Sequence, residues 1–313
     1  TIGIRGAGAG ERLLGNGTFL SGFHENSRIT YPEDAYGLAR VGQTIQGVPD
    51  SSDFHMLLDG RPIEDSASTS VQRIDFRRGV STVTQDYVFG PGRTLTVTTG
   101  RMTCLFEPNL ALITLNLLGK GLEGSSLEVD GRLNVQTRTT GTPSDDPRKG
   151  HAEGAGIERI LRETAWPATR RGHAGEPALA EGLSTSDVVD VYRCRNSRLS
   201  MAVGLRQYVN GSRTNSTHWR FYFDGDESID VIRYAAYHSY ELEPRGVYEG
   251  LRSSTRRPQD PARLAAHCRR TLERYGGQDP SRVLRKQRAW LSIFWRRSDV
   301  EIDSLDGGRL PSL

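Results

Sequence analysis

The chain of 313 residues is long enough to form one large domain or two domains of average size, with a sizeable buried core. Its 41 basic and 38 acidic residues leave a formal charge of +3, which excludes the strong basic excess typical of nucleic-acid and anionic-membrane binding. No run of about 18 apolar residues is present, so we predict no membrane span.

The first residues and the cysteines indicate a cytoplasmic protein. Residues 1–10 carry neither a basic stretch nor an apolar core, so they do not predict a signal peptide. They are typical of the middle of a strand-and-turn unit, and we expect further chain to precede them. Cys104, Cys194 and Cys268 have no metal-ligand spacing and leave an odd thiol, which favours unbridged cysteines in a reducing compartment.

Most of the chain up to about residue 240 is rich in strand signals. Alternating apolar and polar residues over 81–89 and 94–99, separated by Gly90-Pro-Gly-Arg93, predict a β-hairpin. Further strands are predicted over residues 111–118, 126–130, 188–192, 199–209, 219–223 and 228–240. Many short strands with frequent turn signals predict an all-β fold, a large antiparallel β-sandwich or supersandwich.

The strand pattern is interrupted over residues 139–187, where glycine, proline, serine and charged residues predominate. We predict a loop-rich insertion there, with room for one short helix over 157–162.

Two helices are predicted after the strands. Asp260 precedes a proline, which combines a favourable N-cap residue with a residue tolerated at the first helical position. Leu264, Cys268 and Leu272 then share one face, and Gly276 ends the helix.

The second helix follows Asp279 and is predicted to carry an aromatic face. Val283, Trp290 and Phe294 align on one stripe, and Trp295 lies beside it. We expect Trp290, Phe294 and Trp295 to pack against another domain. The predicted organisation is therefore a β-sandwich domain over 1–250 and a helical linker over 251–313.

The segment from Phe19 to Thr44 is the candidate binding loop, because polar and aromatic groups are concentrated between two strand-like runs. The candidate substrate-binding residues are Phe23, His24, Glu25, Tyr31, Glu33, Asp34 and Tyr36. A tyrosine could stack on a pyranose ring and His24 could bond a sugar hydroxyl. The structural alternatives are that the aromatic residues hold the loop to the core and that His24 bonds within the loop.

The carboxylates of this segment are also candidates for catalytic acids. Glycoside cleavage commonly uses two carboxyl groups, about 5–5.5 Å apart for retention and roughly 6.5–9.5 Å apart for inversion. Glu25, Glu33 and Asp34 are suitable in chemical type, but three acids in one loop are unremarkable among 38 in the chain. We therefore predict a loop-structuring or sugar-binding role for them, and no catalytic residue and no metal site in the chain.

Short motifs in a fixed order support a family resemblance. The chain carries IGIRG at 2–6, GTFLSGFHE at 17–25, LLDG at 57–60, DFRRGV at 75–80, DGR at 130–132, DPR at 146–148, QRAW at 287–290, FW at 294–295 and SDVEI at 298–302. This ordered set resembles the amino-terminal region of glycoside hydrolase family 65, which contains the maltose, trehalose and kojibiose phosphorylases.

The resemblance implies a β-sandwich and a helical linker that lead to an (α/α)6 barrel bearing the general-acid glutamate and the phosphate-binding residues. We expect this chain to stop near the beginning of that barrel. The implied partners are an α-glucosyl disaccharide and phosphate, bound by the full-length enzyme, together with the catalytic barrel and a second copy in a homodimer. No cofactor is implied.

Two other functions stay open at this point. The chain could be a free-standing carbohydrate-binding module, or an assembly subunit that partners a separate barrel chain. The parent enzyme could also be a hydrolase, in which water and not phosphate attacks the disaccharide.

Overall fold

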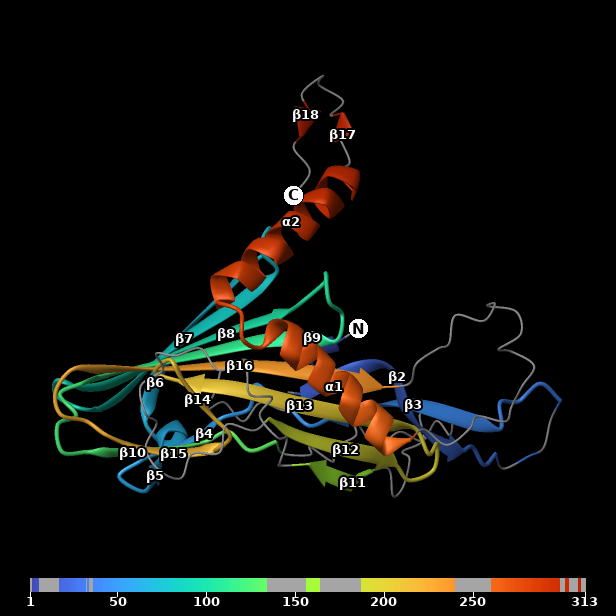
Figure 1. Ribbon diagram of the computed structural model, residues 1–313, viewed down its shortest axis with the longest axis horizontal. Helices are drawn as coiled ribbons and strands as arrows, with labels where there is room; N and C mark the ends of the chain where they lie inside the picture. Colours follow the sequence, from blue (N-terminus) through green and yellow to red (C-terminus); the bar gives the residue numbers. More distant parts are fainter. Residues whose placement is uncertain are drawn as a thin grey trace, which may run out of the picture.

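The computed structural model describes residues 2–5, 17–31, 33, 36–133, 156–163, 187–239, 260–298, 302–303 and 309–310. Antiparallel sheets make up most of this part of the chain, and two helices follow them (Figure 1). The predicted all-β fold class is therefore confirmed.

The largest sheet has nine antiparallel strands. Along the sheet they are β11 (Ile157–Glu163), β12 (Val188–Cys194), β13 (Ser200–Val209), β16 (Glu227–Ser239), β9 (Leu110–Lys120), β8 (Arg93–Thr103), β7 (Val80–Gly90) and β6 (Ala67–Asp75), and β14 (Ser212–Thr214) pairs with β13. The hairpin predicted from alternation is β7–β8, with Gly90 opposite Arg93. Every strand predicted from residue 188 onward is present.

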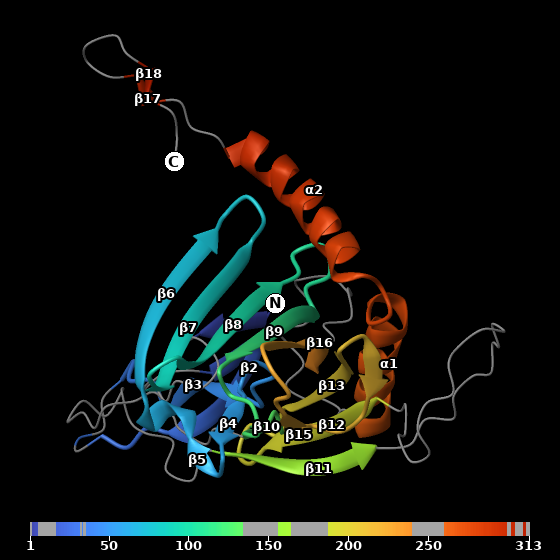
Figure 2. The ribbon, with the colours of Figure 1, turned by 90° about the vertical axis from the view of Figure 1, so that its left-hand side faces the viewer.

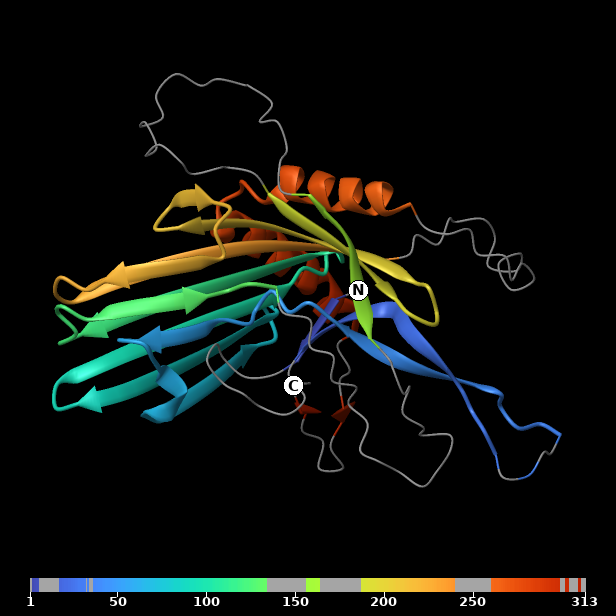
Figure 3. The same cartoon turned by 90° about the horizontal axis from the view of Figure 1, so that it is seen from below.

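Smaller sheets lie against one face of the large sheet (Figures 2 and 3). One contains β1 (Ile2–Arg5), β2 (Gly17–Arg28) and β3 (Val41–Val48). Another contains β15 (His218–Tyr222), β10 (Ser126–Asp130), β4 (His55–Leu58) and β5 (Arg61–Pro62). A 3-10 turn over Ile63–Asp65 follows β5 in the chain. A short pair, β17 (Ile302–Asp303) and β18 (Arg309–Leu310), comes last in the chain.

The main hydrophobic core fills the space between these layers. Leu95, Ile113 and Val231 contribute from the large sheet, and Met56 and Val129 face them from the smaller one. All five side chains are at most 1% exposed. The period-2 alternation seen in the sequence is thus the division between core-facing and outward-facing positions, and each buried aliphatic side chain stabilises the sandwich by about 1.5–3 kcal/mol.

A second core lies on the other face of the large sheet, under helix α1 (Pro261–Tyr275) (Figure 1). Leu264, Cys268 and Leu272 are buried against strands β12, β13 and β16, as their shared face predicted. Asp260 caps the helix, because its carboxylate accepts the Ala262 N–H at 3.0 Å. The capping prediction is confirmed.

The short helix predicted over 157–162 is wrong, because this segment forms strand β11. It pairs antiparallel with β12, and Arg162 bonds the carboxylate of Asp190 at 2.7 and 2.8 Å. The cause is non-local: β12 offers an edge and a buried carboxylate that outweigh the weak local preference for helix. Apart from Gly156, Glu163 and Asp187, the rest of the predicted insertion, including His151 and His173, lies outside the described residues.

Helix α2 (Pro280–Ser298) leads away from the sandwich (Figure 2). Asp279 accepts the Ser281 N–H at 3.1 Å, so the predicted helix start is confirmed. Neither described helix is long and apolar enough to cross a membrane. The boundary predicted between a sandwich over 1–250 and a linker over 251–313 stays a prediction.

Candidate functional site

The segment predicted to be a binding loop forms a long β-hairpin. β2 runs to Arg28 and pairs with β3 from Val41 onward, so Phe23, His24 and Glu25 lie on a strand and not in a loop. The alternation was hidden because the charged residue Glu25 occupies an inward position and because the register shifts between Phe19 and His24. The hairpin projects beyond the sandwich (Figure 3).

The inner face of the hairpin is fixed to the sandwich. Phe23 is buried in the main core, and Glu25 is fully buried. The Glu25 carboxylate accepts backbone N–H groups from Asn26 at 3.0 Å, Asn196 at 3.1 Å and Ser197 at 2.6 Å. The Ser197 hydroxyl also donates to the carbonyl oxygen of His24 at 2.7 Å. Charge-assisted bonds of this kind are strong, so Glu25 anchors the hairpin to the turn between β12 and β13.

The outer face carries polar atoms that are shielded from solvent but have no hydrogen-bond partner among the described residues. They are Nε2 of His24, Oδ1 of Asn26 and the hydroxyl of Tyr31. On the inward side of β3, Oε1 of Gln46 is likewise buried without a partner among the described residues. His24 keeps only a 3.2 Å contact between Nδ1 and the Gly22 carbonyl. Each unpaired buried group costs about 1–3 kcal/mol, so this face is chemically suited to a polar ligand or partner.

Apolar side chains stand beside these polar atoms. Val41 and Ile45, both on β3, are 56% and 64% exposed, and Tyr36 near the end of the hairpin is fully exposed. Glu33 is also exposed, whereas Tyr31 is half-buried. Asp34 lies outside the described residues. Of the predicted substrate-binding residues, Glu33 and Tyr36 are thus exposed and His24 and Tyr31 are half-buried, whereas Phe23 and Glu25 are buried.

The three aromatic residues predicted for interdomain packing form a ladder on α2. Trp290 and Phe294 are stacked, with ring centroids 6.0 Å apart and planes at 11°, and Trp295 meets Phe294 edge-on at 5.2 Å. Trp295 donates its indole N–H to the Phe76 carbonyl at 3.1 Å. Trp290 and Phe294 remain 39% and 43% exposed.

The buried stripe of α2 is a different one. Val283, Gln287 and Leu291 follow at intervals of four residues, and all three are at most 4% exposed. The Gln287 amide donates to the Thr103 carbonyl at 3.1 Å and accepts the Leu105 N–H at 2.9 Å. Val283 therefore packs on the sandwich with Gln287 and Leu291, and Gln287 bonds the strand edge at the centre of this contact. The packing of Trp290, Phe294 and Trp295 against another domain stays a prediction.

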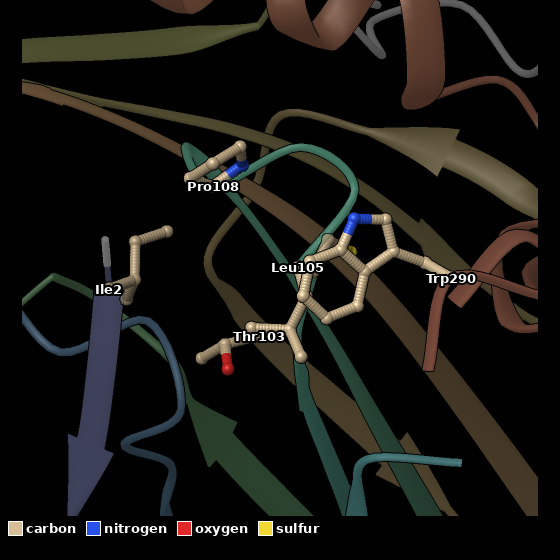
Figure 4. A pocket seen from close by; sticks show the side chains of 6 residues that line it. Ile2, Thr103, Leu105, Pro108 and Trp290 are labelled. Carbon is tan, nitrogen blue, oxygen red and sulfur yellow. The ribbon is translucent and has the colours of Figure 1, made fainter. Parts of the chain in front are cut away.

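An apolar hollow of about 210 Å³ opens beside the aromatic ladder (Figure 4). It is lined by Ile2, Thr103, Cys104, Leu105, Pro108 and Trp290. Burial raises the pKa of the Cys104 thiol to about 12, so the thiol is protonated at neutral pH and is a poor nucleophile. The hollow can accept an apolar side chain, but its lining offers little for polar chemistry.

The part of the chain that the structure describes shows neither a metal site nor an exposed cysteine thiol. No three His, Cys, Asp or Glu side chains there gather closely enough to hold a metal ion. Cys104, Cys194 and Cys268 are all buried free thiols. What the described residues build is therefore a hairpin with an unsatisfied outer face and a helix with an exposed aromatic face.

Comparison with known proteins decides the family. The model of the glycosyl hydrolase family 65 N-terminal domain matches residues 1–292. The chain belongs to this family. It is 31% identical over 316 residues to the alpha,alpha-trehalose phosphorylase of Thermoanaerobacter brockii, a match that covers 96% of this chain and 37% of that protein.

Two further proteins are similar to most of this chain. An uncharacterized glycosyl hydrolase of Mycobacterium tuberculosis is 25% identical over 322 residues, covering 96% of this chain and 36% of the relative. A solved structure assigned as a kojibiose phosphorylase from the human microbiome has a TM-score of 0.61 over 90% of this chain and 32% of its own, at 8% identity, which is a likeness of fold. The family 65 chain described here thus spans about a third of the length of these relatives.

Two of the motifs that resemble family 65 are explained by close packing. In DFRRGV, Gly79 has a φ of 64°, and a Cβ there would lie 2.8 Å from Nε2 of Gln287, which belongs to the QRAW motif. In DGR, a Cβ on Gly131 would lie 2.3 Å from a guanidinium nitrogen of Arg233. Gly79 therefore allows Gln287 of α2 to pack closely on the sheet, and Gly131 leaves space for the Arg233 side chain in the core.

Arg233 is a buried residue that the sequence analysis missed. It is fully buried, and it donates to the carbonyls of Ser51 at 2.8 Å and Gly131 at 2.9 Å and to Oε1 of Gln207 at 3.0 Å. Its guanidinium lies 4.4 Å from the ring centroid of Phe54. The signal was available, because Arg233 occupies an inward position of an alternating strand.

Proposed function

We propose that this chain is a non-catalytic N-terminal domain of an inverting α-glucosyl disaccharide phosphorylase or hydrolase. In the phosphorylase, phosphate attacks the glucosyl carbon and gives β-glucose 1-phosphate and a free sugar. A glutamate of a catalytic barrel domain protonates the leaving oxygen. The single observation that carries the proposal is the family match over residues 1–292, in a chain that spans about a third of its relatives' length.

The placement of the acids supports a non-catalytic role. Glu25 is fully buried and its carboxylate is occupied by three backbone N–H donors. An acid that delivers a proton to a glycosidic oxygen must reach the substrate within hydrogen-bond distance. Glu33 is exposed, but it stands on a projecting hairpin where water would surround the reaction.

The hairpin supports a role in shaping the sugar site. Its inner face is held by Glu25, so the position of its outer face is defined relative to the sandwich. Tyr36 offers an exposed ring for a pyranose face. Nε2 of His24 has no partner among the described residues but is shielded from solvent, so the imidazole must turn outward to bond a sugar hydroxyl. We propose that these two groups border the glucose site of the catalytic barrel.

The exposed face of α2 supports packing on that barrel. Trp290 and Phe294 present a stacked apolar surface next to the hollow that Ile2 and Pro108 line. Exposed aromatic surface of this kind is typical of an interface between domains. We propose that the catalytic domain covers it and places an apolar side chain in the hollow.

The first test is an activity assay of the chain printed here, with the full-length protein as positive control. Both are incubated with trehalose, kojibiose, nigerose and maltose, with and without phosphate, and glucose and glucose 1-phosphate are measured. We expect turnover by the full-length protein alone. Phosphate-dependent release by residues 1–313 would place the acid within them and overturn the proposal.

The second test examines the hairpin in the full-length protein. We expect Tyr36→Ala and His24→Ala to raise the Michaelis constant for the disaccharide about tenfold, equivalent to losing about 1.4 kcal/mol of binding. Tyr222→Ala is the matched control, because Tyr222 is an exposed tyrosine on β15, a strand of another sheet. Unchanged constants and an unchanged disaccharide preference in both hairpin variants would refute the proposed role.

A further inference from the structure

The turn between helices α1 and α2 is bonded to the large sheet by two tyrosine hydroxyls. Tyr208 of β13 donates to the carbonyl oxygen of Gly276 at 3.0 Å. Tyr234 of β16 donates to the carbonyl oxygen of Gln278. The two tyrosine rings meet edge to face, with centroids 6.3 Å apart and planes at 85°. The last carbonyls of a helix have no partner within it, so these bonds from the sheet determine where the turn lies.

The turn is also closed by contacts of its own. The side-chain amide of Gln278 donates to the carbonyl oxygen of Arg274 at 2.7 Å. Lys286, in the second turn of α2, donates to Oε1 of Gln278 at 3.3 Å, and its ammonium group lies 5.0 Å from the ring centroid of Tyr275. The end of α1 and the start of α2 thus form one bonded unit, and the two tyrosines fix this unit to the sheet.

Helix α2 is fixed at two more points along its length (Figure 2). Gln287 bonds the strand edge at Thr103 and Leu105. The indole N–H of Trp295 donates to the carbonyl oxygen of Phe76 at 3.1 Å. At 1.5 Å per residue, these points lie roughly 14 Å and 26 Å from the turn. Hydrogen bonds are directional, so bonds at three points define both the tilt and the rotation of α2 relative to the sandwich.

We infer that Tyr208 and Tyr234 are positioning residues, which set the orientation of the catalytic barrel relative to the hairpin by fixing the start of α2. The inference rests on the proposed function, in which the barrel packs on α2 and the hairpin of β2 and β3 borders its sugar site. Groups on two domains bind one sugar only while the domains keep their relative orientation, and linked domains move unless a contact restrains them. The 19 residues of α2 span about 28 Å, so a change of about 5° in tilt moves one end by about 2.5 Å relative to the other. A binding group must be held within about 0.5 Å of its working position.

The hydroxyls can be tested separately from the rings. Tyr234 is 1% exposed in the second core, and Tyr208 packs against the same core, so both rings also contribute to folding. Tyr208→Phe and Tyr234→Phe keep the rings and remove only the bonds to the turn. Tyr192→Phe is the matched control, because Tyr192 is a buried tyrosine of the main core whose hydroxyl bonds Asp190 at 3.3 Å, away from the turn.

The experiment uses the full-length protein with phosphate and whichever of trehalose, kojibiose, nigerose and maltose it turns over. The Michaelis constant and kcat are measured, and hydrogen exchange is followed in α2, β13 and β16. We expect the Tyr208→Phe and Tyr234→Phe pair to raise the Michaelis constant about fivefold, with kcat unchanged within about twofold. Amide exchange in α2 should become about tenfold faster, while exchange in β13 and β16 stays at the wild-type rate. Tyr192→Phe should change neither the Michaelis constant nor exchange in α2.

A second arm repeats the tyrosine pair in a protein that already carries Tyr36→Ala and His24→Ala. The pair should raise the Michaelis constant no further there, because the tyrosines act through the hairpin. Full additivity, or a raised constant without faster exchange in α2, would overturn the inference, since the tyrosines would then act by another route. An unchanged constant in the tyrosine pair, with raised constants in Tyr36→Ala and His24→Ala, would overturn the inference alone and leave the proposed function standing. If the hairpin variants themselves leave the constant unchanged, the proposed role of the hairpin fails and the inference fails with it.

Discussion

Replacing the buried carboxylate of Glu25 by an amide tests the claim that this residue anchors the hairpin. The Asn196 N–H is shared between the two carboxylate oxygens, at 3.2 Å from Oε1 and 3.1 Å from Oε2. In Glu25→Gln the amide oxygen in the place of Oε1 can keep all three N–H donors, but the amide NH2 group then faces the N–H of Asn196. The three bonds therefore fall from charge-assisted to neutral strength, and two donors oppose each other at Asn196. The expected loss is about 3 kcal/mol of local stability.

A loss of that size corresponds to amide exchange faster by on the order of a hundredfold, at the turn between β12 and β13 and along β2. Hydrogen exchange of the full-length protein measures it. Glu33→Gln is the matched control, since Glu33 is exposed on the same hairpin and its substitution should change stability by less than about 0.5 kcal/mol. Equal exchange in the two variants would refute the anchoring argument. Lost turnover in Glu25→Gln without faster exchange would instead assign the carboxylate to the chemistry.

Three further predictions follow from buried polar groups. Burial, with smaller effects of His267 and Arg270, lowers the pKa of His238 to about 4, so the unfolded state binds a proton before the folded state does as the pH falls. The contribution of His238 to stability should therefore be constant above about pH 6.5 and decline between about pH 6.5 and 4. His238→Gln should flatten that decline in thermal-unfolding measurements at a series of pH values. Gln287→Leu should lower the stability of the contact between α2 and the sheet by about 2–4 kcal/mol, because the Thr103 carbonyl and the Leu105 N–H lose their hydrogen-bond partner. Amide hydrogen exchange in α2 should then become faster, and unchanged exchange there would contradict this prediction. Arg233→Met should lower the temperature midpoint of unfolding, because three buried acceptors lose their donor. An unchanged or raised midpoint would show that the free energy of desolvating the guanidinium exceeds the free energy gained from its hydrogen bonds.

The features that the sequence predicted correctly are local ones. The β7–β8 hairpin and the helix starts at Asp260 and Asp279 depend on residues within a few positions of one another. The failures are non-local. Residues 157–162 became a strand because of Asp190, and the hairpin around His24 was read as a loop although a turn about 170 residues later fixes it.

The candidate site was predicted only in part for the same reason. The sequence located the hairpin as a concentration of polar and aromatic residues, but it could not separate its two faces. The two faces are distinguished only by their distant partners. Asn196 and Ser197 bond Glu25 on one face, whereas Nε2 of His24 on the other has no partner among the described residues. Residue types in a strand indicate what chemistry is present, whereas its register and its distant neighbours decide which side chains are free to use it.

If the proposed function is correct, the two faces of this hairpin together explain how a non-catalytic domain influences a reaction. A group that borders a substrate must be held within about 0.5 Å of its working position, which a free loop does not achieve. Here the bonds of Glu25 fix one side of β2, and alternation then sends the neighbouring His24 to the other side. The same logic applies to α2, where Gln287 and Leu291 fix one stripe and leave Trp290 and Phe294 outward. In both elements a buried contact to the sandwich determines which residues are presented to a partner.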